Sequence, residues 1–246
     1  DARRGPGGRP LLLPIVACAV QGGDRFLRVL LAVRGGGHNG GGLGICDGGM
    51  VIDLSGIKFV RVNTSDNTVR VGGGNVWGEV DHGTHPFGLA VPAGIISTTG
   101  VGGLTLGGGV GHLSRRYGLT IDNLLEADMV LADGSFVTAS ASENQDLYWA
   151  IRGGGGNFGV VTSFKFQAHP VRTVIGGPTL WPIERTEEIM EWYHGFIHNA
   201  DEDLNGFIAT MVMPGPPFPE FLHMNKYCGI VWCYTGEPSE FDSIFE

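Results

Sequence analysis

The chain has 246 residues, enough for one large domain or two smaller ones around a buried core. Hydrophobic residues make up 42% of it and charged residues only 17%, which is typical of a folded protein and not of a disordered one. The formal net charge of −9 argues against nucleic acid or an anionic membrane surface as a partner, because both favour basic patches.

The four cysteines do not indicate a disulfide scaffold or a metal site. Cys228 and Cys233 lie in an apolar, strand-like run, KYCGIVWCY, at a spacing that points them to opposite faces of a strand. We therefore expect buried free thiols and no metal.

Nothing in the sequence indicates a membrane segment or a secretion signal. No stretch reaches the roughly 18–20 apolar residues that span a bilayer, and the apolar segment 11–20 lacks a clear cleavage site. We expect a cytoplasmic protein, and the sequence does not indicate its oligomeric state. The chain starts without methionine and stops inside an apparent helix start, so we expect it to be a piece of a longer protein.

The first predicted elements are strands. Leu11–Val20 and Phe26–Val33 read as buried strands with a very short connection, so they are either antiparallel or separated by missing residues. Met50–Ser55 is a third predicted strand. The runs Phe59–Val62 and Thr68–Val71 predict a hairpin, because both alternate and a turn sequence separates them.

A short amphipathic helix and a long loop come next. Asn75–His82 carries valines at i and i+4 and predicts the helix. The stretch 91–118 has little periodicity and is interpreted as irregular. Long irregular stretches inside compact domains are usually functional, which makes this one a candidate for ligand binding.

The following segments predict a hairpin, a helix and a strand. Leu125–Leu131 and Ser135–Ala139 flank an Ala-Asp-Gly turn. Ser142 is the expected N-cap of a helix that runs through Ile151, and Val160–Phe166 is the next strand.

Beyond Pro170 the glycine content falls, and an acidic helix is predicted around Glu184–His198. We place a domain boundary near 170–175, which gives domains at 1–172 and 173–246.

The unusual feature of the composition is 43 glycines, well above the average usage of about 7%. They cluster at 35–44, 72–74, 100–111 and 153–159, between apolar runs. Clusters of this kind indicate loops where the backbone turns sharply or approaches a ligand closely.

Two GxGxxG matches are false as evidence for a Rossmann fold. The match at 35–40 follows a strand but continues as GGLGICDGG, which does not form the helix that the motif requires. The match at 154–159 lies after a helix and before a strand, in the wrong order. A P-loop sequence is absent.

Consecutive glycines can instead direct several backbone N–H groups into one concavity, a nest that binds phosphate. The sequence VRGGGHNGG fits such a nest. Arg34 lies beside it, either as a further phosphate ligand or as a structural ion-pair partner. His38 lies at the tip of the loop, where an imidazole is reactive or simply faces solvent.

Three long motifs resemble, in this order and spacing, the berberine-bridge-enzyme group of flavoproteins, within the PCMH-type FAD-binding superfamily. The motifs are VRGGGHNGGGLGICDGGMVIDLS, VPAGIISTTGVGGLTLGGGVGHLSRRYGLTIDN and DLYWAIRGGGGNFGVVTSF. The similarity covers residues 31–170, and the run FPEFLHMNKYCGIVWCYTG is similar to bacterial members. The resemblance implies an α+β fold: a PCMH-type FAD-binding domain of two α/β subdomains, followed by the start of an α+β substrate domain.

The resemblance implies FAD as the cofactor, bonded covalently through His38 to the 8α-methyl group of the flavin. It assigns the pyrophosphate to backbone amides at 35–39. Some members form a second link through a cysteine, but Ile96 stands at the corresponding place, so we expect one link only.

The other motifs imply further contacts with the cofactor. The stretch 94–104 would run along the isoalloxazine ring, 107–112 along the ribityl and phosphate region, and Val160 or Val161 beside the adenine. Thr98 and Thr99 either lie near the flavin or form ordinary loop hydrogen bonds, and His112 either contacts a phosphate or packs in the loop. The residues predicted to bind the cofactor are Arg34, Gly35, Gly36, Gly37, His38, Asn39, Gly40, Gly94, Thr98, Thr99, Gly100, Gly103, Leu104, Gly107, His112, Asn123, Gly159, Val160 and Val161.

The implied activity is hydride transfer from a small alcohol, sugar or amine to the flavin, with molecular oxygen as the reoxidant and hydrogen peroxide as product. A dehydrogenase with another electron acceptor and a flavin-binding protein without turnover are the alternatives. No catalytic base is assigned. The resemblance implies that the base comes from the substrate domain or a later segment, and this chain ends before most of that region. The acidic and histidine side chains of the predicted helix 184–198 are interpreted as a solvated face: Glu184, Glu187, Glu188, His194 and His198.

Overall fold

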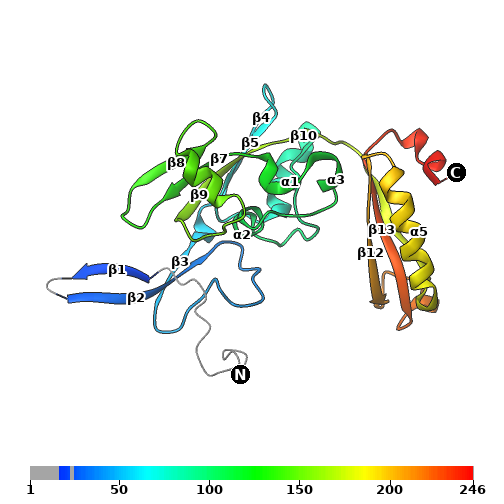
Figure 1. The fold of residues 1–246 in the computed structure, drawn as a ribbon, viewed down its shortest axis with the longest axis horizontal. Helices are drawn as coiled ribbons and strands as arrows, with labels where there is room; N and C mark the ends of the chain where they lie inside the picture. The colour runs from blue at the N-terminus through cyan, green and yellow to red at the C-terminus, as the bar shows by residue number, and fades with distance from the viewer. Residues whose placement is uncertain (1–16, 23–24, 246) are drawn as a thin grey trace.

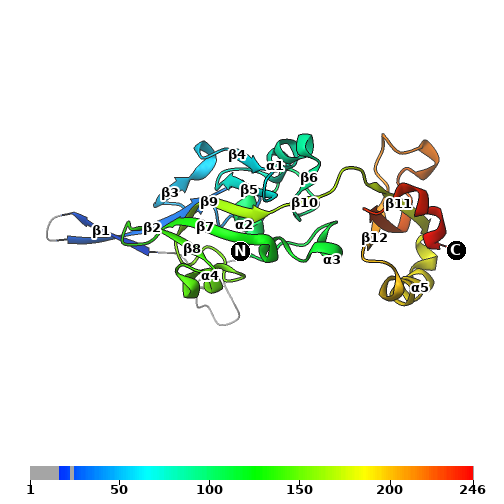
Figure 2. The same cartoon turned by 90° about the horizontal axis from the view of Figure 1, so that it is seen from above.

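The computed structural model describes residues 17–22 and 25–245. Figures 1 and 2 show two units side by side, joined by one connecting segment. We call them the N-terminal unit, residues 17–170, and the C-terminal unit, residues 175–245. Each has its own hydrophobic core. Mixed helices and strands confirm the predicted α+β class.

The chain begins with an antiparallel hairpin. β1 (Ala17–Gly22) pairs with β2 (Arg25–Arg34), with Ala17 opposite Leu30. This pairing explains the short connection between the two strands, while the first residues of the predicted strand, 11–16, lie outside the described residues. β3 (Met50–Asp53) pairs in parallel with β2, so the glycine loop at 35–49 is the crossover between two parallel strands.

An antiparallel sheet forms the body of the N-terminal unit. Its order is β4-β5-β9-β7-β8. Both predicted hairpins are confirmed, β4 with β5 and β7 with β8. The bounds of the strands are Val60–Asn63 for β4, Thr68–Gly72 for β5, Leu124–Val130 for β7, Phe136–Ser140 for β8 and Val160–Gln167 for β9.

The core of this unit lies on one face of the sheet. Val71, Met129 and Phe164 are buried there, and Trp77 and Val80 of helix α1 (Trp77–Thr84) pack against them. The expected short helix at 75–82 is thus present, shifted by two residues at each end.

The stretch at 91–118 is not wholly irregular, which corrects the expectation from its lack of periodicity. It contains α2 (Val101–Leu106) and α3 (Ser114–Tyr117). Val101, Thr105 and Leu106 are buried, so packing of one helix face outweighs the low helix propensity of glycine.

The start of the next helix is also corrected. α4 (Gln145–Ile151) has Asn144 as its N-cap, with a left-handed backbone at φ 47°, instead of Ser142. Ser142 lies in the preceding turn, where its backbone N–H donates to the Ser140 hydroxyl.

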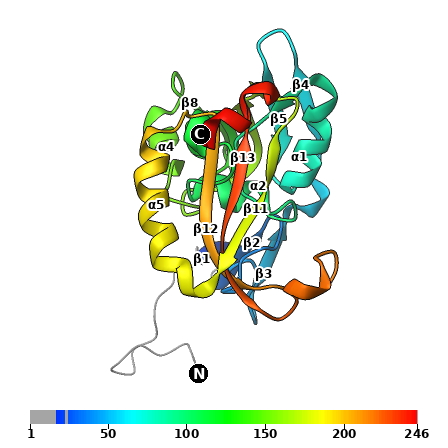
Figure 3. The same cartoon turned by 90° about the vertical axis from the view of Figure 1, so that its right-hand side faces the viewer.

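The C-terminal unit is a sheet covered by one helix. Its strands, in the order β11-β13-β12, are antiparallel neighbours, and Figures 1 and 3 show α5 along one face of the sheet. Ile230 and Trp232 of the central strand pack against the helix residue Ile189. The bounds are Ile175–Pro182 for β11, Thr186–Asn199 for α5, Leu204–Val212 for β12 and Lys226–Tyr234 for β13.

Two short strands close the N-terminal unit before the connection. β6 (Leu89–Ala90) pairs with β10 (His169–Pro170), and residues 171–174 then lead to β11. Cys228 and Cys233 are buried free thiols, as expected. Short 3-10 turns lie at Leu54–Gly56, His85–Phe87, Thr120–Asn123, Ile183–Arg185, Glu220–Leu222, Pro238–Glu240 and Asp242–Phe245.

A polar network lies across the central strands of the larger sheet. Arg70 pairs with Glu126 and, at 2.5 Å, with Asp128, and it donates to the Ser163 hydroxyl at 3.1 Å. The Arg70 side chain is 31% exposed and that of Asp128 only 18%, so solvent screens these pairs incompletely. Removing the arginine would leave two partly buried carboxylates beside each other.

We expect Arg70→Ala to lower the free energy of unfolding by about 2 kcal/mol, between the values for an exposed pair and a buried one. Arg61→Ala is the matched control. Arg61 lies opposite Arg70 on β4 and is exposed, and in the described chain its guanidinium contacts only the Phe59 ring. We therefore expect Arg61→Ala to lower the free energy of unfolding by less than about 0.5 kcal/mol. Urea unfolding measures both, and equal losses would contradict the role of the network.

Candidate functional site

A cleft of about 510 Å³ lies between the glycine-rich loops of the N-terminal unit. This volume is in the range of small-molecule and cofactor sites. Four segments that are distant in the sequence, each with one of the glycine clusters, form most of its walls, and Leu54 adds to them. The lining residues are Val33, Arg34, Gly35, Gly36, Gly37, His38, Asn39, Leu43, Gly44, Leu54, Gly73, Thr99, Gly100, Gly102, Gly103, Leu104, Leu106, Gly155, Gly156, Gly159, Val160, Val161 and Phe164.

The cleft depends on a contact between two backbones. A Cβ atom on Gly36 would lie 2.3 Å from the Cα atom of Gly100, and one on Gly100 would lie 2.6 Å from the Gly36 nitrogen. Real Cβ atoms essentially never approach so closely, so both positions require glycine. This contact holds the loop after β2 against the N-terminal end of α2.

A second close approach forms the floor. A Cβ atom on Gly73 would lie 2.3 Å from the Val161 carbonyl oxygen, and the Gly73 N–H donates to the Thr162 carbonyl at 2.7 Å. The turn after β5 therefore lies directly against β9, beside the place where Val160 and Val161 line the cleft.

The loop after β2 lines the cleft with residues 35–39 and has unpaired backbone N–H groups there. Within the described chain, the N–H groups of residues 35–41 donate no hydrogen bond to a protein acceptor. Gly37 has a left-handed backbone at φ 71°, the kind of alternation that builds an anion-binding nest. The Asn39 side chain steadies the far side of the loop by accepting from the Leu43 N–H at 3.1 Å.

The position of Arg34 is compatible with both roles that the sequence left open, a structural ion pair and a phosphate contact. Its Nη1 atom lies 3.4 Å from a carboxylate oxygen of Asp53, across the parallel pair of β2 and β3. The Nε atom lies 3.3 Å from the position of a Cβ on Gly37, directly under the nest. The pKa of Asp53 is lowered, first by the hydrogen bond from the Ser55 N–H and then by other contacts that include Arg34.

His38 lines the cleft from the tip of the loop, and its side chain is exposed. Thr99 lines the opposite wall, beside the N-terminus of α2. Ile96 is 48% exposed and brings no nucleophilic group to this wall.

Thirteen of the nineteen residues predicted to bind a cofactor line this cleft. The six others lie outside its lining: Gly40, Gly94, Thr98, Gly107, His112 and Asn123. Gly94 lies under Leu104, since a Cβ there would meet the Leu104 side chain at 2.4 Å.

The side chain of Asn123 is engaged within the protein. Its amide nitrogen donates to the carbonyls of Tyr117 and Leu119 at 2.9 and 2.8 Å, and its oxygen lies 2.6 Å from a ring nitrogen of His169. His112 stacks on Phe207 of β12, with ring centroids 5.4 Å apart. Its Nδ1 atom is buried and has no hydrogen-bond partner among the residues that the structure describes, and burial lowers the pKa of the imidazole, which favours the neutral ring at neutral pH.

Sequence reasoning missed ten lining residues, and some of them carried a usable signal. Gly73 belongs to the glycine cluster at 72–74, and Gly155 and Gly156 belong to the one at 153–159. The apolar residues look like ordinary core positions in the sequence. The other missed residues are Val33, Leu43, Gly44, Leu54, Gly102, Leu106 and Phe164.

The lining fits a large, partly aromatic and anionic cofactor. Leu104, Leu106 and Phe164 supply apolar walls, and the unpaired amides of residues 35–39 and the Arg34 side chain are groups that could bind an anion. Among the residues that the structure describes, no group of three or more histidine, cysteine or acidic side chains is arranged to hold a metal ion. No helix in that same part of the chain is long and apolar enough to cross a membrane.

Comparisons with known proteins agree with this fit. Residues 24–140 match the FAD binding domain family. An FAD-linked oxidoreductase of Dictyostelium discoideum is 43% identical over 165 residues, which is 67% of this chain and 36% of that protein.

Solved structures show the same fold. The 6-hydroxy-D-nicotine oxidase of Arthrobacter nicotinovorans superposes with a TM-score of 0.77 at 29% identity, over 88% of this chain and 47% of that one. A variant of berberine bridge enzyme gives 0.76 at 26% identity, over 87% and 43%. The chain therefore spans less than half the length of these relatives. Over residues 24–140 the chain matches the FAD binding domain family, and its fold is that of the berberine-bridge-enzyme-like, PCMH-type FAD-linked oxidoreductases.

Proposed function

We propose that the cleft holds FAD in an extended pose, with the pyrophosphate on the amides of residues 35–39. The observation that carries this proposal is the row of backbone N–H groups without an acceptor in the described chain, in a loop that the close contact of Gly36 with Gly100 holds in place. Arg34 adds a positive charge beside this row. Thr99 and Leu104 would lie along the isoalloxazine ring, and Val160 and Val161 beside the adenine.

We further propose a single covalent link from His38 to the flavin. His38 lies at the tip of the loop after β2, which we call the cradle (residues 35–39), and lines the cleft. Its exposed side chain is free to approach a bound group. The position of a second link holds Ile96, which has no nucleophile. A tether of this kind prevents loss of the cofactor.

The proposed reaction is oxidation of a small alcohol, sugar or amine. Bound FAD would supply the acceptor for a hydride from a substrate C–H, which is chemistry of the cofactor. The substrate also loses a proton from its O–H or N–H, and oxygen finally takes the two electrons and two protons to leave as hydrogen peroxide. The residues of this chain bind and orient the flavin and keep water from it with apolar walls.

The C-terminal unit is the proposed start of a substrate-binding domain, with the boundary at 172–173. Glu187, Glu188, His194 and His198 of α5 are exposed on the side of the sheet away from the cleft, so none of them is a candidate base. The base would therefore come from elsewhere in the protein.

The covalent link is tested by acid denaturation. We expect the yellow colour to stay with the precipitated protein, and His38→Ala to release the flavin into the supernatant while retaining non-covalent binding before denaturation. His82→Ala changes an exposed histidine of α1 and serves as the control. Intact flavin in the wild-type supernatant would show that the link does not exist.

The cradle is tested at Gly100. Because a methyl group there overlaps the Gly36 backbone, we expect Gly100→Ala to lower the flavin content of purified protein roughly tenfold. Gly56→Ala is the control, since a Cβ at Gly56 meets nothing within 4 Å. The absorbance ratio of flavin to protein measures the effect. Equal flavin content in both variants would contradict the proposed cradle.

The reaction is tested with a panel of alcohols, sugars and amines. We expect at least one to bleach the flavin absorbance anaerobically, and air to restore it with one hydrogen peroxide per turnover. Bleaching that only an artificial dye reverses would identify a dehydrogenase. A flavin that no substrate of the panel reduces would favour a binding protein without turnover.

A further inference from the structure

The sequence SRRYG (114–118), at the end of the stretch 91–118, has no part in the lining of the cleft. It forms α3 and the turn after it, on the side of the N-terminal unit that faces the C-terminal unit (Figure 2). Its two arginines do not point to an anion site. Both reach across to the C-terminal unit.

Arg115 binds the end of helix α5. Its Nη1 atom donates to the carbonyls of Asp201 and, at 2.7 Å, Leu204, and its Nη2 atom donates to those of Ile197 and Ala200 at 2.8 and 2.5 Å. The Ile197 and Ala200 carbonyls lie in the last turn and C-cap of the 14-residue helix, where the helix dipole is negative, and the two others lie in the turn that follows and at the first residue of β12. A planar guanidinium is suited to bind several such acceptors at once.

Arg116 adds a second contact next to the first. It forms an ion pair with Asp203 and donates to the Thr235 hydroxyl at 3.2 Å. Asp203 and Thr235 lie at the adjoining ends of β12 and β13. The two arginines therefore bind the helix and the sheet of the C-terminal unit at the same end.

α3 is itself anchored in the N-terminal unit. The Asn123 amide binds the Tyr117 carbonyl, and the Tyr117 ring stacks on His169 at 4.1 Å, next to the contact between His169 and Asn123. At its other end, the Ser114 hydroxyl accepts from the Gly111 N–H at 2.9 Å. These contacts explain the role of Asn123 outside the cleft.

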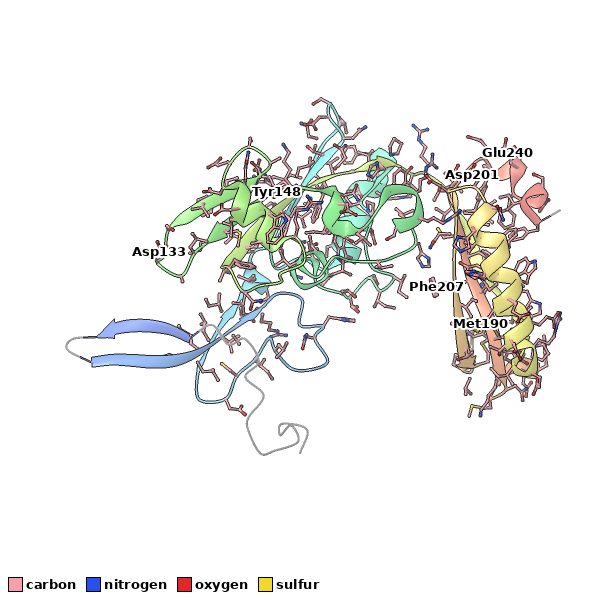
Figure 4. The ribbon with its side chains drawn as sticks, in the orientation of Figure 1. Asp133, Tyr148, Met190, Asp201, Phe207 and Glu240 are labelled. Carbon is pink, nitrogen blue, oxygen red and sulfur yellow. The ribbon has the colours of Figure 1, made fainter. Side chains whose placement is uncertain are left out.

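The geometry matters because residues 171–174 are the covalent connection between the units. A single connecting segment leaves one unit free to rotate about it. Arg115 provides a second attachment, so that the orientation is defined. The face of the β11-β13-β12 sheet that α5 does not cover, which we call its open face, then lies toward the N-terminal unit. Phe207, which is labelled in Figure 4, stacks on His112 there.

We propose that Arg115 is a positioning residue for the flavin reaction, which fixes the open face of the β11-β13-β12 sheet toward the cleft by capping α5 from the other unit. This proposal rests on the proposed function for the reaction that it serves. We call the contacts of Arg115 and Arg116 with the C-terminal unit the joint. Whether the joint holds the two units together can be tested without any substrate.

The test uses the full-length, FAD-loaded protein and two readouts. Arg172 is exposed in the connecting segment and is a site for trypsin. We expect Arg115→Ala to raise the rate of cleavage after Arg172 about tenfold, because proteolysis follows the population of the open arrangement. The cleavage rate of Arg115→Lys should lie between those of the wild type and Arg115→Ala, since an ammonium group cannot reach four carbonyls with the same geometry.

The second readout is anaerobic flavin reduction. We expect Arg115→Ala to lower the limiting rate of reduction about tenfold with the flavin content unchanged, a loss that a general stability defect would not confine to this step. The matched control is Arg185→Ala, which removes an exposed arginine that pairs with Glu188 within the C-terminal unit. We expect it to change neither rate.

Each outcome decides a separate point. Wild-type cleavage rates in Arg115→Ala would overturn the joint, whatever the substrate result. Faster cleavage with unchanged reduction would retain the joint and overturn its role in positioning. If Arg115→Ala does not fold, Arg115→Lys and Arg116→Ala must show the faster cleavage, and protection equal to wild type in both would overturn the proposal. A wild-type flavin that no substrate reduces would count against the proposed function, and cleavage would still decide the joint.

Discussion

The cleft exists because Gly36 and Gly100 have no side chains. Their backbones lie so close that a methyl group on either would overlap the other loop. This contact fixes the loop after β2 at the N-terminal end of α2, where residues 35–39 line the cleft and their N–H groups donate no hydrogen bond to an acceptor in the described chain. The proposed phosphate nest and the position of His38 both depend on this arrangement of two backbones.

Local patterns were sufficient to predict the hairpins and the strands around them. The β4-β5 and β7-β8 pairs carry alternation and turn residues in one short segment, and all the information that specifies them is local. Helix α2 could not be predicted in this way, because its sequence VGGLTL has poor helix propensity and its stability comes from the buried side chains of Val101 and Leu106. The cap at Asn144 likewise depends on the turn before it and not on side-chain chemistry alone.

The resemblance located the loops of the site better than it located individual side chains. Residues of the stretches 35–39 and 99–104 line the cleft, whereas Asn123 binds residues within the N-terminal unit and His112 stacks on Phe207 of the C-terminal unit. A motif preserves every residue that its loop needs, whether that residue contacts a ligand or supports its neighbours. The role of Arg115 was invisible in the sequence for a further reason: its partners are backbone carbonyls, which any residue supplies.

Backbone groups have a central part in both recognition surfaces of this chain. Amide N–H groups would bind the pyrophosphate in the proposed flavin site, beside side chains such as Arg34 and His38, and the carbonyls at the end of α5 accept hydrogen bonds from Arg115. Such surfaces tolerate changes in most neighbouring side chains, which leaves the open face of the β11-β13-β12 sheet free to vary. If that face is directed at the flavin, side chains such as Phe207 can change the substrate without disturbing either the cradle or the joint. A constant cofactor site and joint, combined with a sheet face whose side chains vary, is the arrangement expected of a fold in which one cofactor serves many substrates.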